Sequence, residues 1–461
     1  MIGVIFYFLF QLAIWCSSND KGIWRFHEEV KESTETSNDR KELKKVDMQE
    51  NTTFIGMHGK KKVFIENSAK HIFICGTTGS GKTVALSNFI ESIFKYDYPT
   101  LIVDGKGDIG SGSIYDYVLK FQQIYPNKKV YVVDMNNPKT CDKYNPFFQA
   151  NHKNPTIIRD MLISMTDWSE EHYKLNASRY IGKVIYMMIE NDIDLTLQSI
   201  INHMSVSSFT SLSMALQKKN KITKQIHLEN VKMAETVSKI VEGTIARFSL
   251  LIESDIGSIF NANNGAIDIP MALNENAIIL FILNPLIYPE ISPLFGRLIT
   301  IDAKQGVSSL FHKRFSRTFY IFDEVSIYAS KELLLLVNLS RSANITSILA
   351  TQSLSDLDSV DVSLRKQVIE SCNNYIIMRQ NEPSNAEVWA NTIGTRNKMN
   401  ITYQIKNEQS MTDTTGLGSA RMTREYLYHP DIIKNLKLGE AIYLSKDKNV
   451  HYKLKINKPK I

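Results

Sequence analysis

The stretch HIFICGTTGSGKT, from His71 to Thr83, decides the fold. An apolar run typical of a buried strand leads into glycines, and the helical pattern VALSNFIESIFKY follows. Glycines in the pattern G-x-x-x-x-G-K-[ST] let successive backbone N–H groups turn toward phosphate oxygens, and the start of the helix adds positive charge. The stretch therefore predicts a phosphate-binding loop. Its residues are Gly76, Thr77, Thr78, Gly79, Ser80, Gly81, Lys82 and Thr83.

Such a loop needs an acidic strand end, and RTFYIFDEVS provides one at Asp323 and Glu324. We expect Lys82 to reach the β- and γ-phosphates and the Thr83 hydroxyl to bind magnesium. Asp323 is expected to hold the same ion through water, and Glu324 to polarise the attacking water as general base. The predicted cofactors are ATP and Mg. Alone, the acidic pair is equally typical of a solvated strand end; its combination with the loop favours catalysis.

A third strand, ITSILATQS, ends in Thr351 and Gln352. A polar side chain beside the acidic strand can contact the γ-phosphate and report its hydrolysis. This makes Gln352 a further candidate catalytic residue, although ordinary strand-end polarity explains it equally well.

Strand and helix patterns alternate around the phosphate loop, which predicts an α/β fold with a mostly parallel central sheet. The strands TLIVDGKGD and KVYVVDMN follow the loop, and strand-like runs resume at AIILFIL. Between them the pattern is helical. We therefore predict a nucleotide-binding domain in two parts, 51–151 and 263–461, interrupted by an all-α insertion domain at 152–262.

The N-terminus differs in kind from the rest of the 461-residue chain. Residues 1–18 are mostly apolar and predict a short transmembrane anchor, and the polar residues 19–50 predict a linker or stalk. Basic residues follow the apolar run, which places the remainder in the cytoplasm. A buried helix, or a start that truncates a longer membrane region, remains an alternative.

The amino-acid composition excludes few classes of function. The formal net charge of +6 permits a nucleic-acid partner but does not establish one. Four cysteines, widely spaced and without a CxxC pair, disfavour a disulfide framework or a zinc site.

Several motifs, taken in order, resemble one family. They are HIFICGTTGSGKT, TLIVDGKGD, KYNPF, FYIFDEVSIYAS and LSRSANITSILATQSLSDL. Together they resemble the conjugative coupling proteins of type IV secretion systems, which are relatives of the FtsK and HerA translocases. By position the resemblance makes Lys82 and Thr83 the phosphate and magnesium ligands. It makes Asp323 and Glu324 the acidic pair, and Gln352 the sensing glutamine.

The resemblance also implies an assembly and a task. It implies a homo-hexameric ring of RecA-like motors, anchored in the inner (plasma) membrane and facing the cytoplasm. ATP hydrolysis would recruit a relaxase with its single-stranded DNA and pump the complex into the secretion channel.

A ring motor needs an arginine that reaches the neighbour's ATP. Arg247, Arg297 and Arg341 are candidates, and the sequence does not choose among them. For DNA, the visible basic clusters are Lys60–Lys62 and the lysines of QKKNKITK, although such runs are more often solvated faces. Trp168 is more typical of packing than of base stacking.

Two other functions compete with DNA pumping. In the first, the chain is a docking receptor: ATP stabilises the ring, and the insertion binds a protein substrate. In the second it is a double-strand DNA pump of the FtsK kind. The second is disfavoured because the last strands of the sheet are expected to use most of the roughly 100 residues after Gln352, leaving no winged DNA-reading domain.

Overall fold

The structure is a computed structural model that describes residues 51–460, apart from 68–69, 148–153, 261, 263–264, 311–316 and 409–410. The predicted anchor, 1–18, and linker, 19–50, lie outside the described residues. Among the helices that are described, none combines the length and apolar character that a membrane crossing requires.

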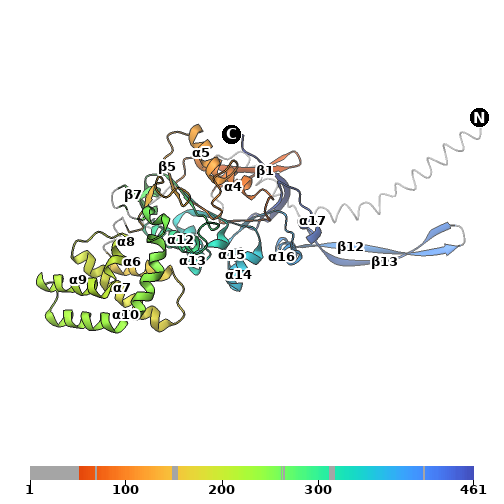
Figure 1. The fold of residues 1–461 in the computed structure, drawn as a ribbon. Coiled ribbons are helices and arrows are strands. Elements are labelled where there is room, and N and C mark those ends of the chain that lie inside the picture. Colours follow the sequence, from red (N-terminus) through yellow and green to blue (C-terminus); the bar gives the residue numbers. More distant parts are fainter. Residues whose placement is uncertain are drawn as a thin grey trace, which may run out of the picture.

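One twisted eleven-stranded sheet forms the centre of the molecule (Figure 1). In spatial order its strands are β2 (Lys61–Glu66), β1 (Thr52–His58), β15 (Val450–Ile456), β14 (Glu440–Ser445), β11 (Asn374–Ile377), β3 (Ile72–Cys75), β10 (Ile345–Thr351), β9 (Thr318–Asp323), β4 (Thr100–Asp104), β8 (Ile278–Ile282) and β5 (Val130–Asp134). From β11 to β5 all neighbours are parallel, and the four strands from β2 to β14 are antiparallel. The predicted mostly parallel α/β sheet is confirmed.

Helices cover both faces of the parallel strands, as their continuously apolar sequences require. On one face lie α4 (Lys82–Lys95) and α5 (Ile114–Ile124). On the other lie α11 (Ile269–Asn274), α12 (Ile291–Leu310), α13 (Lys331–Ser340), α14 (Leu354–Val360), α15 (Val362–Ser371) and α16 (Pro383–Ile393). Single turns η3 (Val325–Ile327) and η4 (Arg341–Ala343) flank α13.

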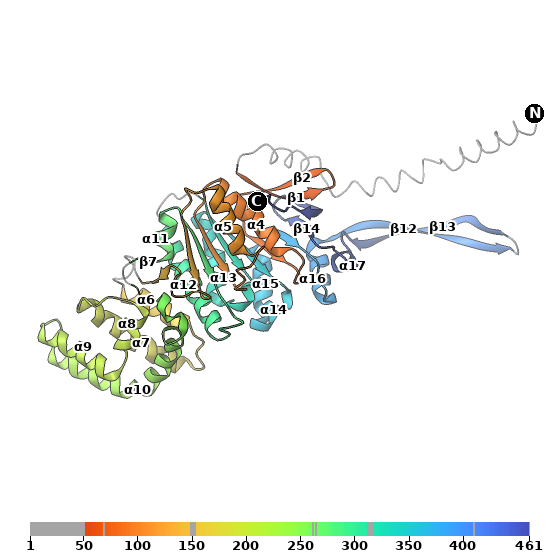
Figure 2. The same cartoon turned by 45° about the horizontal axis from the view of Figure 1, so that its top comes forward.

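A group of helices occupies the range predicted as the insertion. They are α6 (Pro155–Ser164), α7 (Glu171–Glu190), α8 (Leu197–His203), α9 (Val206–Lys218) and α10 (Lys224–Ile252), followed by the turn η2 (Asp255–Ile259). Figure 2 shows them at one end of the molecule. Two short parallel strands, β6 (Lys143–Tyr144) and β7 (Ala266–Ile267), pair before and after them and bring the two ends of the helical segment together.

The segment after α16 differs from the expectation. Strands β12 (Thr395–Glu408) and β13 (Met411–Tyr426) pair with each other in a separate two-stranded ribbon, which projects from the body in Figure 1. Helix α17 (Pro430–Lys434) then leads back to β14. The expectation that the main sheet uses most residues after Gln352 is therefore wrong. No strand was predicted over residues 395–426, so the ribbon itself was missed.

Candidate active site

The phosphate loop connects the C-terminal end of β3 to α4, as predicted. Gly79 and Gly81 have φ angles of +73° and +110°, which side chains rarely adopt, so glycine is required for the curl of the loop. At Gly76 an added Cβ would lie 2.5 Å from the Cβ of Met378. Helix α4 starts at Lys82, and the half-buried Thr83 lies in its first turn.

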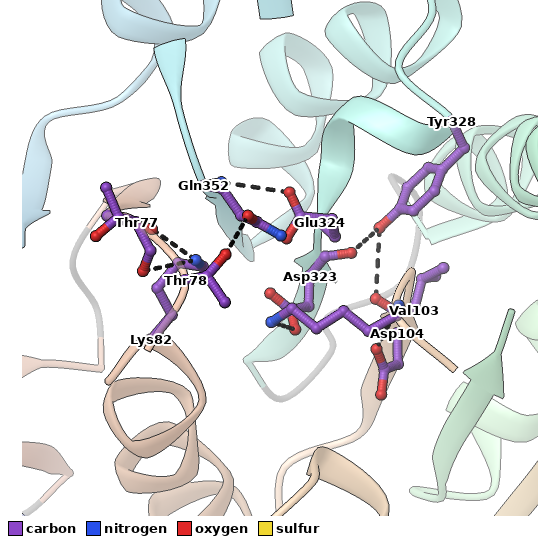
Figure 3. Close-up of polar contacts among 11 residues, drawn as sticks. Thr77, Thr78, Lys82, Val103, Asp104, Asp323, Glu324, Tyr328 and Gln352 are labelled. Atoms are coloured by element: carbon purple, nitrogen blue, oxygen red, sulfur yellow. Dashed lines mark hydrogen bonds and ion pairs between the residues drawn. The ribbon is translucent and has the colours of Figure 1, made fainter. Parts of the chain in front are cut away.

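Lys82 is buried and folds back onto its own loop. Its Nζ donates to the Gly76 carbonyl at 2.5 Å and to the Thr77 carbonyl at 3.5 Å (Figure 3). Burial lowers the pKa of Lys82, and the nearby Lys106 ammonium lowers it further. The side chain therefore holds its cation at the mouth of the loop, where phosphates bind in loops of this kind.

The acidic pair lies at the end of β9, two strands from β3. Asp323 and Glu324 are 1% and 5% exposed. Glu324 has a left-handed backbone (φ 49°, ψ 50°), a conformation that costs free energy for a non-glycine residue and is often found at functional sites. Burial raises the pKa of Glu324, and the Asp323 carboxylate raises it further. A raised pKa makes a carboxylate a stronger base, which suits a group that accepts a proton.

Gln352 joins the phosphate loop to the acidic pair. It follows β10, the strand between β3 and β9. The Thr78 hydroxyl donates to Gln352 Oε1 at 2.6 Å, and the Gln352 backbone N–H donates to Glu324 Oε1 at 3.3 Å. Figure 3 shows this chain of contacts across the site. The structure thus brings together the residues predicted from three separate stretches of sequence.

The next strand, β4, contributes residues that sequence reasoning did not assign to the site. The buried Asp104 lies opposite Asp323 in the β4–β9 register. Burial, and then the Asp323 carboxylate, raise the pKa of Asp104 to about 7. Lys106 Nζ donates to Asp323 Oδ2 at 2.7 Å. Burial opposes its charge, but the Asp323 carboxylate and this hydrogen bond raise the pKa of Lys106 above its ordinary value.

Tyr328 fastens the ends of these two strands together. Its buried hydroxyl donates to the carbonyl oxygens of Asp323 at 3.1 Å and Val103 at 3.4 Å (Figure 3). The signal for Lys106 was present in the sequence as the stretch DGKGD after a strand, but it served there only to support a family resemblance. No sequence pattern around Tyr328 predicted that it would join the two strand ends.

The donor set near the loop fits a magnesium ion. Asp323 Oδ1 and Glu324 Oε2 are buried and have no hydrogen-bond partner among the described residues. Carboxylate and hydroxyl oxygens are the ligands that Mg²⁺ prefers. Asp323 and Thr83 are therefore residues that could hold the ion, and their role as its ligands stays a prediction.

The three candidate arginines lie in different surroundings. Arg297 pairs with Asp167 at 2.8 Å, and Arg247 donates to the Asp167 carbonyl at 3.3 Å and stacks over Trp168. Trp168 packs against the core, as expected, and donates to the Ile163 carbonyl. Arg341 is exposed at the end of α13, where its side chain has neither a hydrogen bond nor an ion pair within the part of the chain that the structure describes.

The predicted basic clusters lie far apart in the fold. Lys60, Lys61 and Lys62 lie at the β1–β2 turn, with Lys61 over the Tyr452 ring. The second cluster, Lys218, Lys219, Lys221 and Lys224, lies between α9 and α10, where Lys221 pairs with Glu190 at 2.8 Å.

Solved structures similar to this chain are known. The coupling protein TrwBdeltaN70, in its unbound form, has a TM-score of 0.63 at 14% identity, covering 91% of this chain and 92% of that one. TrwB in complex with ADP and Mg²⁺ gives 0.62 at 14% identity, over 91% and 93%. VirB4 of Thermoanaerobacter pseudethanolicus gives 0.53 at 10% identity, over 89% and 98%. These likenesses show a shared fold.

A search of curated protein sequences finds no match. A family model does match: it describes the DNA-binding domain of type IV secretion-system coupling proteins and covers residues 58–456. Because the match spans most of the chain, the chain belongs to the family of type IV secretion-system coupling proteins.

Proposed function

We propose that this chain is an ATPase that couples ATP hydrolysis, with magnesium, to the recruitment and translocation of DNA into a type IV secretion channel. One observation carries the proposal: Gln352 contacts both Thr78 of the phosphate loop and Glu324 of the acidic pair. The family description supports DNA as the partner. Structures of TrwB with ADPNP and with ADP and Mg²⁺ support the nucleotide and the metal.

Each residue has a distinct task in this proposal. When nucleotide binds, Lys82 exchanges the loop carbonyls for the β- and γ-phosphate oxygens, which are better partners for an ammonium group. Thr83 and Asp323 hold the magnesium ion, which neutralises charge on the phosphates. Glu324 accepts the proton of the attacking water. Gln352 changes its contact to Thr78 when the γ-phosphate leaves and transmits this change along β10.

Arg341 is the residue we assign to a neighbouring subunit's ATP. Arg247 and Arg297 are engaged with residues 167 and 168 of the same chain, whereas the Arg341 side chain is exposed. It follows α13, the helix that lies in the chain between the acidic strand β9 and β10, the strand that Gln352 follows. This assignment requires a ring, for which we propose a homo-hexamer.

The proposal also places the chain at a membrane, beside DNA and protein partners. Residues 1–18 anchor the chain in the inner membrane, and the motor lies in the cytoplasm. The relaxase, its single-stranded DNA and the channel components are the partners. Lys60–Lys62, on an exposed turn, supply sequence-independent contacts to DNA phosphates.

ATP binding and hydrolysis by the full chain test the chemical part of the proposal. We expect Lys82→Ala to lose ATP binding. Glu324→Gln should keep ATP binding but lose about 100-fold or more in kcat, the usual contribution of a general base. Lys95→Ala, an exposed lysine at the end of the same helix α4, is the matched control and should behave as wild type. A Glu324→Gln variant that hydrolyses ATP at the wild-type rate would contradict the assignment.

A further inference from the structure

The loop that follows β4, residues 105–108, lies between the ends of two neighbouring strands, β9 and β8. Gly105 donates its N–H to the Asp323 carbonyl at 3.1 Å. On the opposite side, Gly107 has a φ of +72°, and an added Cβ there would lie 2.4 Å from the Leu283 carbonyl oxygen. Both neighbours are backbone atoms of buried strand ends. The two glycines therefore fix the path of the loop and the direction of Lys106 between them.

A second contact, a hydrogen bond to Asp104, orients Lys106 toward the acidic pair. The Asp104 carboxylate accepts the Lys106 backbone N–H at 2.9 Å, which holds the residue at its base. The side chain then spans to Asp323, where Nζ and Oδ2 are 2.7 Å apart. The Asp323 side chain is 1% exposed and that of Lys106 is 29% exposed. A nearly inaccessible carboxylate is thus paired with a cation that can still reach solvent.

The ion pair with Lys106 engages only one of the two carboxylate oxygens of Asp323, Oδ2. The other oxygen, Oδ1, has no hydrogen-bond partner among the described residues and is buried. A buried carboxylate without a counter-charge is costly, so the charged form of Asp323 is favoured only beside a cation. A divalent ion and an ammonium group on the same carboxylate repel each other, so the two compete.

We propose that Lys106 is the resident counter-ion of Asp323 in the metal-free site and that it yields this carboxylate when the divalent ion binds. The inference rests on the proposed binding of ATP and magnesium. Lys106 is then a positioning residue: it keeps Asp323 charge-balanced and oriented for the metal. Its flexible four-carbon stem lets the released ammonium turn toward the phosphates.

The test uses the full chain, wild type and Lys106→Met, with two titrations. The first measures the affinity for a fluorescent non-hydrolysable ATP analogue in excess EDTA. The second measures, by electron paramagnetic resonance, the Mn²⁺ concentration that half-saturates the protein–analogue complex. Without Lys106 the Asp323 charge faces the phosphates unscreened, so metal-free nucleotide affinity should fall about tenfold or more. The competing cation is also gone, so half-saturation should need about tenfold less Mn²⁺.

These opposite signs separate the proposal from its rivals. If the Met side chain merely distorts the loop, the affinities for metal-free nucleotide and for Mn²⁺ both fall. If Lys106 has no part in the site, neither affinity changes. Either result overturns the proposal. Lys106→Arg, which keeps a cation, should restore metal-free nucleotide affinity toward wild type. Lys120→Met, a surface lysine paired with Asp116 on α5, is the control. Failure of the wild type to bind the analogue even with metal would overturn the proposed function itself.

Discussion

Substitution of Gly105 by alanine tests how the backbone around β4 holds the acidic pair, Asp323 and Glu324, in place. Gly105 follows β4 at the point where this strand lies beside Asp323 and Glu324. Its φ lies outside the left-handed region, so alanine fits the backbone itself. The added Cβ, however, would lie 2.9 Å from the Asp323 carbonyl oxygen and 3.0 Å from that of Glu324. The first contact is shorter than real Cβ atoms show, and the second is tighter than most of them. Both are to backbone that cannot move without moving the acidic pair.

We therefore expect Gly105→Ala to cost about 1–3 kcal/mol of unfolding free energy, the usual cost of overpacking a well-packed region. It should also lower kcat for ATP hydrolysis, since a displacement of about 1 Å at a catalytic group can cost about 100-fold. Denaturant unfolding and steady-state hydrolysis on the full chain measure the two effects.

Gly243→Ala is the matched control for this substitution. Gly243 lies within α10, and an added Cβ there meets no atom within 4 Å. Alanine at this position should stabilise the protein by roughly 0.5–1 kcal/mol, because glycine is a poor helix former. The reasoning is refuted if Gly105→Ala unfolds and hydrolyses ATP as wild type does.

Three further predictions concern single residues. Arg341→Ala should leave the ATP dissociation constant unchanged while lowering kcat about 1000-fold, as removal of an arginine finger does; an unchanged kcat would exclude Arg341. Gln352→Ala should keep ATP binding and lower kcat about tenfold or more, the value of one or two hydrogen bonds; full hydrolysis would make the Thr78–Gln352 contact incidental. Burial lowers the pKa of His71 to about 4, and its Nδ1 accepts the Ser347 N–H, so the folded state keeps this imidazole neutral. The unfolded chain then binds more protons between pH 6.5 and 4, and the unfolding free energy should fall by up to about 3 kcal/mol as the pH falls through this window. Replacement by glutamine should flatten that pH profile, and an unaltered profile would contradict the assignment.

The parts of the site that follow from local pattern were predictable. The phosphate loop combines a strand, a glycine-rich turn and a helix start in one continuous stretch. The acidic pair and Gln352 each end a buried strand, and the C-terminal ends of parallel strands meet at one edge of a sheet. The parallel sheet thus predicts that they share one edge, and they meet because β3, β10 and β9 are neighbours in it.

The remaining parts depend on long-range register. Lys106 and Asp323 are 217 residues apart, and they meet only because β4 and β9 are neighbours with Asp104 opposite Asp323. The proposed choice of Arg341 rests on contacts of Arg247 and Arg297 with residues 167 and 168, which the sequence does not reveal. The ribbon of β12 and β13 was missed for a different reason, because no strand was predicted over residues 395–426.

The central claim is that ATP hydrolysis by this chain is coupled to DNA. The most direct measurement is the hydrolysis rate of the full chain with increasing single-stranded DNA, at low and at high salt, beside Lys82→Ala and Glu324→Gln. The account predicts that DNA raises the rate several-fold, that salt weakens this effect because the contacts are to phosphates, and that both variants are inactive. Hydrolysis that is abolished in both variants but indifferent to DNA would contradict it and would favour a docking receptor for protein substrates.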